Sequence, residues 1–221
     1  MSANMLWLIW GATLDTLFMV AVSAVIGVIL GAPLGIFLAT SRAGELFAAP
    51  ALNRVLGAVV NAVRSTPFII LVVAIIPFTR LLTGTSIGTS AAIVPLTIAT
   101  IPFVARLVES SIREVDPGLI EAARAMGASP LQIVWKVLVP EARPSITLGL
   151  TLTVVSLIGY SAMVGAVGGG GLGDLGIRYG YQRFMPEMML AVVVVLIALV
   201  QAVQSTGDLL ARRFDKRSRN T

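Results

Sequence analysis

The sequence predicts an all-helical integral membrane protein, organised as a single transmembrane domain of residues 1–221. Hydrophobic residues make up 57% of the chain and charged residues only 12%, whereas a soluble domain carries about 25% charged residues. The mean hydropathy is +0.93. The apolar residues gather in stretches that approach the roughly 20 residues needed to cross the hydrocarbon core of a bilayer. Lipid must therefore solvate much of the folded chain.

These apolar stretches predict about five transmembrane helices. We expect them at residues 14–39, 56–78, 91–107, 146–167 and 188–202. Residues 1–13 contain no Lys or Arg and no small-residue cleavage site, so we expect a lead-in to the first span and not a cleaved signal peptide. Prolines within or beside the first three spans predict kinked helices whose freed carbonyls are bonded by neighbours in a bundle. These prolines are Pro33, Pro67, Pro77, Pro95 and Pro102.

The positions of the basic residues predict the orientation, because Lys and Arg are retained on the cytoplasmic side of a membrane. All 16 of them except Arg80, Arg178 and Arg183 lie in or beside the segments that follow the first, third and fifth spans. We therefore expect the N-terminus outside and the C-terminus in the cytoplasm. The basic run from Arg212 to Arg219 is expected to lie on the membrane surface.

Cysteine and histidine are absent from the chain. Their absence excludes thiolate metal sites, a cysteine nucleophile and the commonest general base, so we expect no catalytic residue and no metal site. For the same reason we interpret the acidic cluster from Glu109 to Glu121 as a solvated helix face and not as the site of a membrane enzyme. The net charge of +5 comes from basic residues that we expect on the cytoplasmic side of the membrane. It therefore indicates orientation in the membrane, and we expect no nucleic-acid partner.

The predicted spans lack internal ionisable residues that could couple transport to an ion gradient. We place Arg64, Arg106 and Glu109 near the cytoplasmic ends of spans, where their side chains can reach lipid headgroups. A secondary transporter or proton pump carries acidic or histidine side chains inside its bundle. A channel or an ion-coupled carrier is therefore disfavoured, and we expect energy to come from another subunit.

The longest polar segment, from Val108 to Ser145, is expected in the cytoplasm and begins with a short helix. Asp116 can cap this helix, and Pro117 suits its first position. Gly127 can end it in the left-handed conformation. A second short helix follows in the same segment.

Ser129 is expected to cap the second helix, with Pro130 at the first helical position. Gln132 at the third position completes a capping box. We expect Pro140 to end this helix. So many caps are more than a passive linker between two spans needs.

One face of the first cytoplasmic helix suggests what it contacts. Leu119, Ala123 and Met126 have i, i+4, i+7 spacing and predict a shared face. Ala122, Ala123 and Ala125 make the helix narrow, which favours close approach to a protein groove over burial in lipid. An amphipathic loop on the membrane surface is the alternative interpretation.

The residues of this segment resemble the EAA motif of the permeases of ABC importers. The resemblance rests on Glu121, Ala122 and Ala123, followed by Gly127 and Pro140. The family has Ile and Leu where this chain has Val137 and Val139, which are conservative departures. The resemblance implies that the motif residues form a coupling helix that sits in a cleft of an ATPase subunit.

Longer runs are similar to the permeases of methionine importers, between about Arg64 and Tyr181. These runs are Arg64–Phe68, Pro77–Arg80, Gly84–Gly88, Gly159–Met163 and Gly168–Gly173. This similarity implies a type I importer bundle in the bacterial inner membrane that imports methionine, in its D and L forms. It also implies a second copy of the chain, a cytoplasmic ABC ATPase dimer that binds ATP and Mg, and an external substrate-binding lipoprotein. A permease of the same class for another amino acid or small solute is the alternative.

Glycines from Gly168 to Gly173 formally match the dinucleotide motif G-x-G-x-x-G. That motif needs a strand before it and a helix after it, whereas here it follows a membrane span. We interpret it as a flexible outer turn that allows close backbone approach. The two lysines, Lys136 and Lys216, are not preceded by the glycines of a phosphate-binding loop. We therefore expect no cofactor in this chain.

Tyr160 and Met163 are candidates for the transport pathway, because they lie beside glycines in the fourth predicted span. Methionine is unbranched and polarisable, so Met163 could close a constriction or contact a thioether substrate. Simple packing of Met163 in a helix interface is the alternative, and the sequence leaves both open.

Overall fold

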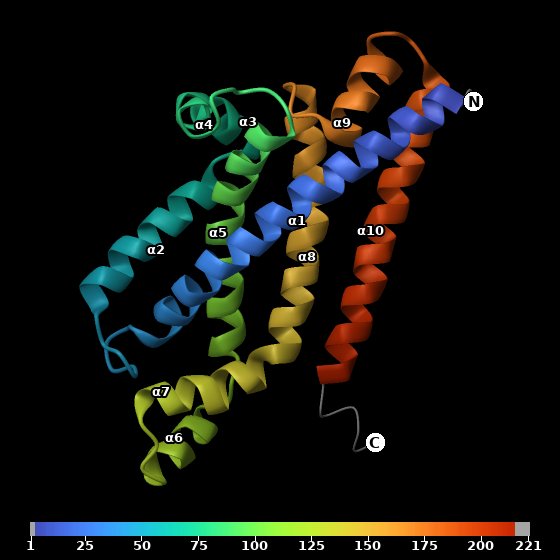
Figure 1. Cartoon of the computed structure of the whole chain (residues 1–221). Coiled ribbons are helices and arrows are strands. Elements are labelled where there is room, and N and C mark those ends of the chain that lie inside the picture. The colour runs from blue at the N-terminus through green and yellow to red at the C-terminus, as the bar shows by residue number, and fades with distance from the viewer. Residues whose placement is uncertain (1–2, 215–221) are drawn as a thin grey trace.

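The computed structural model describes residues 3–214, and every regular element in this range is a helix (Figure 1). This confirms the predicted fold class. In chain order the elements are α1 (Ala3–Thr40), α2 (Pro50–Ser65), α3 (Phe68–Ala74), α4 (Ile76–Thr83), α5 (Thr89–Arg113), α6 (Pro117–Ala125), α7 (Pro130–Ile133), the π-helical η1 (Val134–Leu138), α8 (Val139–Ala166), α9 (Gly171–Leu175), the π-helical η2 (Gly176–Tyr181) and α10 (Pro186–Phe214). Lys216, Arg217 and Arg219 of the predicted membrane-surface run lie outside the described residues.

The described residues contain 4 helices long and apolar enough to cross a membrane, and up to 5 candidate spans when α2 and α3 are taken together. This agrees with the prediction of about five. The first span is longer than expected, because the lead-in residues continue α1 from Ala3. The last is longer as well, since α10 runs to Phe214.

The prediction of one continuous second span over residues 56–78 is wrong. α2 ends at Ser65, α3 begins at Phe68, and the two helices meet at 103°. Pro67 explains the break, because the residue before a proline is driven into extended backbone, and Thr66 has a ψ of 125°. The result is a sharply bent pair of helices, the geometry of a broken span or of a re-entrant loop, followed by the short α4.

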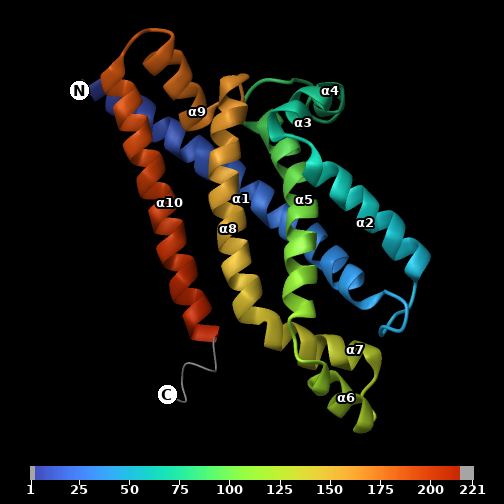
Figure 2. The same cartoon turned by 180° about the vertical axis from the view of Figure 1, so that it is seen from behind.

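The bundle has two distinct ends, which both views show (Figures 1 and 2). α5, α8 and α10 run along the bundle, while α1 crosses it diagonally. The short helices α6 and α7 and the C-terminal end of α10 lie at one end. The N-terminal end of α1, with α3, α4 and α9, lies at the opposite end. α2 leads from the α6–α7 end towards α3.

Three glycines spaced four residues apart, Gly27, Gly31 and Gly35, let α1 lie directly on α5. A Cβ added to Gly31 would lie 2.6 Å from the carbonyl oxygen of Ile101, and one added to Gly35 would lie 2.5 Å from that of Ala105. Small residues at this spacing allow membrane helices to approach closely, where packing and not the hydrophobic effect holds them together. The diagonal crossing of α1 therefore depends on the missing side chains.

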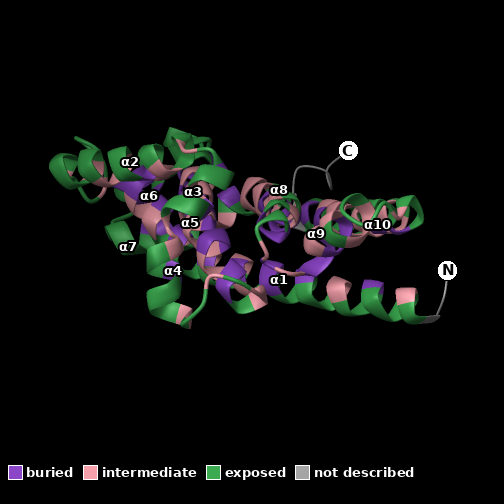
Figure 3. Cartoon of the chain, turned by 90° about the horizontal axis from the view of Figure 1, so that it is seen from above, coloured by how far each residue is buried: buried purple, intermediate pink, exposed green. Residues whose placement is uncertain are grey.

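Three buried clusters hold the spans together. One surrounds Val104 and Leu138, where α5 meets the α6–α7 segment, and a second surrounds Leu96 and Leu157, where α5 meets α8. The third surrounds Leu172 and Met188, where Ile9 of α1 packs against α9 and α10. Many residues of the N-terminal half of α1 are exposed (Figure 3). Large apolar side chains also remain exposed along α10. Apolar surface on this scale is expected of helices that face lipid or another chain.

The prediction that Pro140 ends the second cytoplasmic helix is wrong. Residues 130–166 form one unbroken helical stretch that joins α7 to α8. A π-helical turn precedes the proline, in which the N–H of Val139 donates to the carbonyl of Val134, five residues earlier. Pro140 has no N–H to donate, and the wider turn lets the helix continue past it.

The glycine run from Gly168 to Gly173 forms a packed turn between α8 and α9. Gly168, Gly170 and Gly171 have positive φ. A Cβ on Gly171 would lie 2.6 Å from the hydroxyl oxygen of Thr16. The same hydroxyl accepts a hydrogen bond of 2.9 Å from the N–H of Leu172. Close backbone approach was expected, but the turn is packed against α1 where a flexible one was predicted.

Candidate functional site

The α6–α7 segment is built by the caps that the sequence predicts. The Asp116 carboxylate accepts a hydrogen bond of 2.8 Å from the N–H of Gly118 at the start of α6. Gly127 follows the helix with a φ of 78°, which only glycine adopts without strain. Ser129 and Gln132 form the complete capping box of α7. The segment is therefore rigidly specified at the end of the bundle opposite the N-terminus.

The predicted face of Leu119, Ala123 and Met126 is not buried as one surface. Ala123 is buried in the cluster around Leu138, whereas Leu119 and Met126 are exposed. Met126 lies after the last helical residue as the C-cap of α6. Ala123 thus anchors α6 to the chain's own core.

The outer surface of the segment carries the remaining motif residues. Glu121 and Ala122 are exposed on α6. Met126 is 82% exposed, and Leu131 and Trp135 are also exposed. These apolar side chains lie on α6, α7 and η1 at one end of the bundle, and an exposed apolar cluster of this kind is typical of a protein- or membrane-binding surface. We call these five residues the α6–α7 surface.

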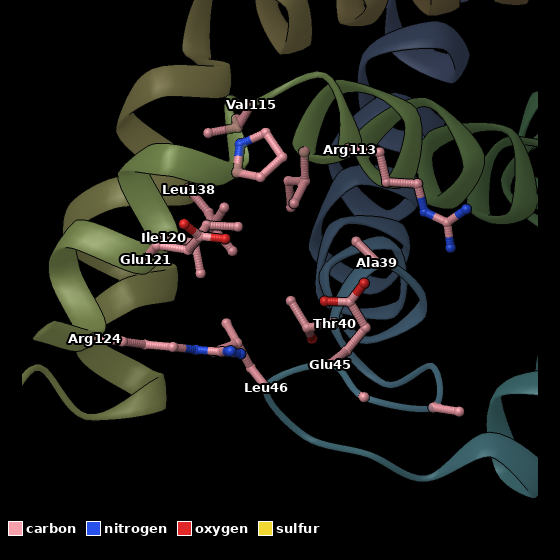
Figure 4. A pocket seen from close by; sticks show the side chains of 14 residues that line it. Ala39, Thr40, Glu45, Leu46, Arg113, Val115, Ile120, Glu121, Arg124 and Leu138 are labelled. Atoms are coloured by element: carbon pink, nitrogen blue, oxygen red, sulfur yellow. The ribbon is translucent and has the colours of Figure 1, made fainter.

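A cavity of about 330 Å³ lies between α6 and the loop that joins α1 to α2. Figure 4 shows Arg124 projecting from α6 towards this loop, with Glu45 on the loop side. Glu121 lines the cavity as well.

Glu109 on α5 is the centre of a buried ionic cluster. The residue is 4% exposed, and its carboxylate pairs with Arg106, with Arg113 at 2.8 Å and with Arg42 at 3.4 Å. Arg106 also donates to the carbonyl of Gly57 on α2 at 3.1 Å. The placement of Glu109 and Arg106 as side chains reaching headgroups is therefore wrong. Their pairing ties α5 to α2 and to the end of α1.

The spacing of this cluster was visible in the sequence, since Arg106 and Arg113 lie three and four residues from Glu109 on one helix. Residues at these separations are neighbours on a helix surface. The participation of Arg42, from a different helix end, could not be read from spacing.

Tyr160 projects from α8 towards α3. Its ring stacks on Phe68 of α3, with ring centroids 4.4 Å apart and planes at 17°. Met163, one turn further along α8, is 49% exposed. Within one copy of the chain the two candidate pathway residues thus have different surroundings: Tyr160 is half-buried against α3, and Met163 is open.

Arg64 does not lie at the end of the bundle that carries α6 and α7. It occupies the last turn of α2, at the bend into α3, and its guanidinium carbon is 5.9 Å from the centroid of the Phe103 ring of α5. The C-terminal end of α2 lies beside α3, away from the α6–α7 end of the bundle (Figures 1 and 2). The prediction that the spans hold no ionisable side chain away from their cytoplasmic ends is corrected by this arginine.

The bundle of long apolar helices, with a capped helical pair at one end, defines a membrane-spanning permease component of a transport system. Residues 31–220 match the family described as the inner membrane component of binding-protein-dependent transport systems, and the chain belongs to this family. This confirms the predicted membership among importer permeases. The protein is accordingly a multi-pass inner-membrane protein.

Two relatives cover most of the chain. The probable D-methionine transport system permease protein MetI of Vibrio cholerae serotype O1 is 58% identical over 206 residues, which are 93% of this chain and 92% of the relative. The D-methionine transport system permease protein MetI of Escherichia coli K12 is 52% identical over 165 residues, which are 75% of this chain and 76% of the relative.

Solved structures share the fold. One, described as an inward facing conformation of the MetNI methionine ABC transporter, has a TM-score of 0.95 and 49% identity over 98% of this chain and all of the other. Another, described as an amino acid ABC transporter with histidines, has a TM-score of 0.78 and 21% identity over 93% of this chain and 94% of the other. The second likeness concerns the fold alone.

Proposed function

We propose that this chain is the permease subunit of an ATP-driven importer that carries methionine across the bacterial inner membrane. The observation that carries this proposal is the 58% identity, over 93% of the chain, to a relative named for D-methionine transport. The solved structure that is 49% identical is described as part of a methionine transporter. A permease of the same class for another amino acid or small solute is the alternative.

The α6–α7 surface is the proposed site of contact with a cytoplasmic ATPase. Glu121 and Ala122 are exposed on it, with Glu121 also lining the cavity beside the α1–α2 loop, and the exposed Met126 and Trp135 supply apolar contact area. Gly127 sets the direction of the chain between the two helices through its positive φ. Ala123 and Pro140 would contribute indirectly: Ala123 by anchoring α6, Pro140 by its place in the turn between α7 and α8.

The energy would come from ATP bound by the partner. The chain has no Gly-x-x-x-x-Gly-Lys-Ser/Thr sequence, whose backbone N–H groups cradle nucleotide phosphates. ATP and Mg would therefore bind the ATPase dimer, and this chain would contribute no catalytic residue.

The proposed assembly holds two copies of this chain, two ATPase subunits and an external substrate-binding lipoprotein. The exposed apolar side chains of α1, α8 and α10 would face lipid or the second copy. The basic residues favour an orientation with the α6–α7 end in the cytoplasm and the N-terminus outside.

The continuous helical stretch of residues 130–166 supports a mechanism of alternating access. When ATP binding draws the two ATPases together, each would displace the α6–α7 segment of one permease copy. Because α7 continues into α8, this displacement would reach the part of α8 that carries Tyr160 and Met163. The bundle would then open outwards to accept the amino acid from the binding protein.

The proposal is tested by purifying the tagged permease with its ATPase from native membranes and placing the complex in lipid nanodiscs. We expect ATP hydrolysis to rise when methionine-loaded binding protein is added. Binding protein loaded with other amino acids serves as the control.

Three results would change the proposal. Stimulation only by another amino acid would assign the permease to that substrate. Purification without any ATPase subunit would contradict the ATP-driven class. ATP hydrolysis that no loaded binding protein stimulates would contradict the role as an importer.

A further inference from the structure

The bend between α2 and α3 opens a small cavity inside the bundle. It has a volume of about 150 Å³ and receives side chains from α2, α3, α5 and α8. Its lining residues are Val63, Arg64, Thr66, Phe68, Leu71, Ala99, Phe103 and Tyr160. We call this the bend cavity.

The bend cavity combines one positive charge with an aromatic wall. Arg64 lies over the ring of Phe103, and Phe68 and Tyr160 stack on each other beside it. Within residues 3–214 no carboxylate lies within ion-pair distance of Arg64, which is exposed in a single copy of the chain and lines the bend cavity. A guanidinium held along a membrane bundle without an acidic partner is costly, and such residues mark substrate or ion pathways.

The chemistry of the bend cavity fits an amino acid with an apolar side chain. A guanidinium presents N–H donors in a fork that matches a carboxylate, and such charge-assisted pairs are among the strongest hydrogen bonds. Aromatic rings suit an unbranched thioether, because sulfur makes favourable contacts with ring edges. Thr66 adds a hydroxyl at the rim.

We infer that the bend cavity is a transient substrate site of the permease, in which Arg64 binds the α-carboxylate of the transported amino acid and the aromatic residues contact its side chain. This inference rests on the proposed function and deepens it. A charged, aromatic site would let the permease itself select amino acids after the binding protein has released them. It differs from the expectation that the spans hold no internal ionisable residue.

The test uses the permease–ATPase complex in nanodiscs, without binding protein, and a photoreactive diazirine analogue of methionine. After illumination, with and without ATP, the modified residues are mapped by mass spectrometry. We expect adducts on residues 63–71, on residues 99–103 and around Tyr160. Excess methionine should suppress them, whereas methioninol, in which the carboxylate is reduced to an alcohol, should not.

Substitutions of Arg64 sharpen the test. Arg64→Ala should lower the adduct yield, and methionine uptake by the fully reconstituted system, by roughly 10- to 100-fold, as expected for the loss of a charged hydrogen bond. Arg64→Lys should restore part of both. Arg54→Ala is the matched control, because Arg54 is exposed on α2 as Arg64 is, but does not line the bend cavity. It should behave like the wild type.

The outcomes separate this site from the proposed function. If the wild type imports methionine but the adducts lie elsewhere, or if methioninol competes as well as methionine, the site is wrong and the function stands. If Arg64→Ala matches Arg54→Ala in both readouts, the site is equally wrong. A wild-type complex that imports no methionine contradicts the function, and the inference falls with it. The adduct map of the wild type decides the matter even if a variant fails to fold.

Discussion

Gly31 of α1 faces Val104 of α5 so closely that a Cβ on the glycine would lie 2.9 Å from the Cβ of the valine. The same added atom would lie 2.6 Å from the carbonyl oxygen of Ile101. Backbone, and not a flexible side chain, thus limits the space. The diagonal position of α1 across the bundle depends on this contact.

The first prediction follows from this contact. Gly31→Ala should lower the stability of the permease by about 1–3 kcal/mol, because the added methyl forces α1 away from α5. Gly11→Ala on the same helix is the control, since a Cβ there meets no atom within 4 Å. It should leave stability unchanged or raise it by up to about 1 kcal/mol through helix propensity. Equal melting temperatures of the two purified variants would contradict the role of the glycines.

Glu109→Gln should destabilise the bundle by about 2 kcal/mol, because three arginines would lose the carboxylate that they share. The loss is smaller than for a fully buried pair, since solvent reaches the arginines in part. Glu141→Gln, at an exposed position of α8, should change little. Thermal unfolding of both variants in the same detergent checks the difference. A stable Glu109→Gln protein would mean that Glu109 does not hold the cluster together.

The absence of native cysteine permits a clean test of orientation. Met126→Cys places a thiol on the exposed α6–α7 surface, and Thr85→Cys places one in the exposed loop after α4. In intact cells an impermeant thiol reagent should label only the variant at position 85. Labelling at position 126 from outside would overturn both the orientation and the contact with an ATPase.

Gly127→Pro should uncouple the permease without preventing its insertion. Proline cannot adopt the φ of 78° and cannot donate the hydrogen bond of 2.9 Å that Gly127 makes to the carbonyl of Arg124. ATPase association and uptake should fall about tenfold or more, as strain of 1–3 kcal/mol would produce.

Gly84→Pro is a matched control for that change. Gly84 has a φ of 74° and donates an equivalent bond to Arg80, but it lies at the opposite end of the bundle. This variant should keep its ATPase. Loss of the ATPase in both variants would indicate general misfolding, and retention in both would show that the segment is only a linker.

Met163→Ala should raise ATP hydrolysis in the absence of binding protein if Met163 closes the pathway. Because Met163 is 49% exposed in one copy, its truncation should cost less than the 2–5 kcal/mol of a buried methionine. Leu152→Ala is the control, since Leu152 lies three turns away on the same face of α8 and is 53% exposed. A destabilised Met163→Ala complex with unchanged basal hydrolysis would leave packing as its role.

Much of the fold could be predicted because local chemistry determined it. Composition and apolar length predicted the membrane bundle, and the caps at Asp116, Gly127 and Ser129 act within a few residues of themselves. A capping hydrogen bond needs no information from distant parts of the chain. These features are accordingly where sequence and structure agree.

The wrong predictions have two causes: two concern how the backbone responds to a nearby proline, and the third concerns a contact with a distant part of the chain. Pro140 was expected to stop a helix, but a π-helical turn before it lets the chain continue into α8. Arg64 was assigned to a span end because the break at Pro67, which bends α2 from α3 by 103°, was not foreseen. Glu109 was assigned to the headgroups because Arg42 reaches it from the loop after α1.

The contact between α1 and α5 could be predicted only in part. The four-residue spacing of Gly27, Gly31 and Gly35 is visible in the sequence and is typical of close helix contacts in membranes. The identity of the partner helix is not, because nothing in that spacing specifies α5.

The central claim is that this chain imports methionine with energy received from an ATPase. Its most direct test is the methionine concentration inside proteoliposomes that contain the complete complex, with labelled methionine and binding protein on one side and ATP on the side of the ATPase. We expect methionine to accumulate above its outside concentration only when hydrolysable ATP is present, with or without an ion gradient. Accumulation driven by an ion gradient alone, or equilibration that needs no ATP, would contradict the account.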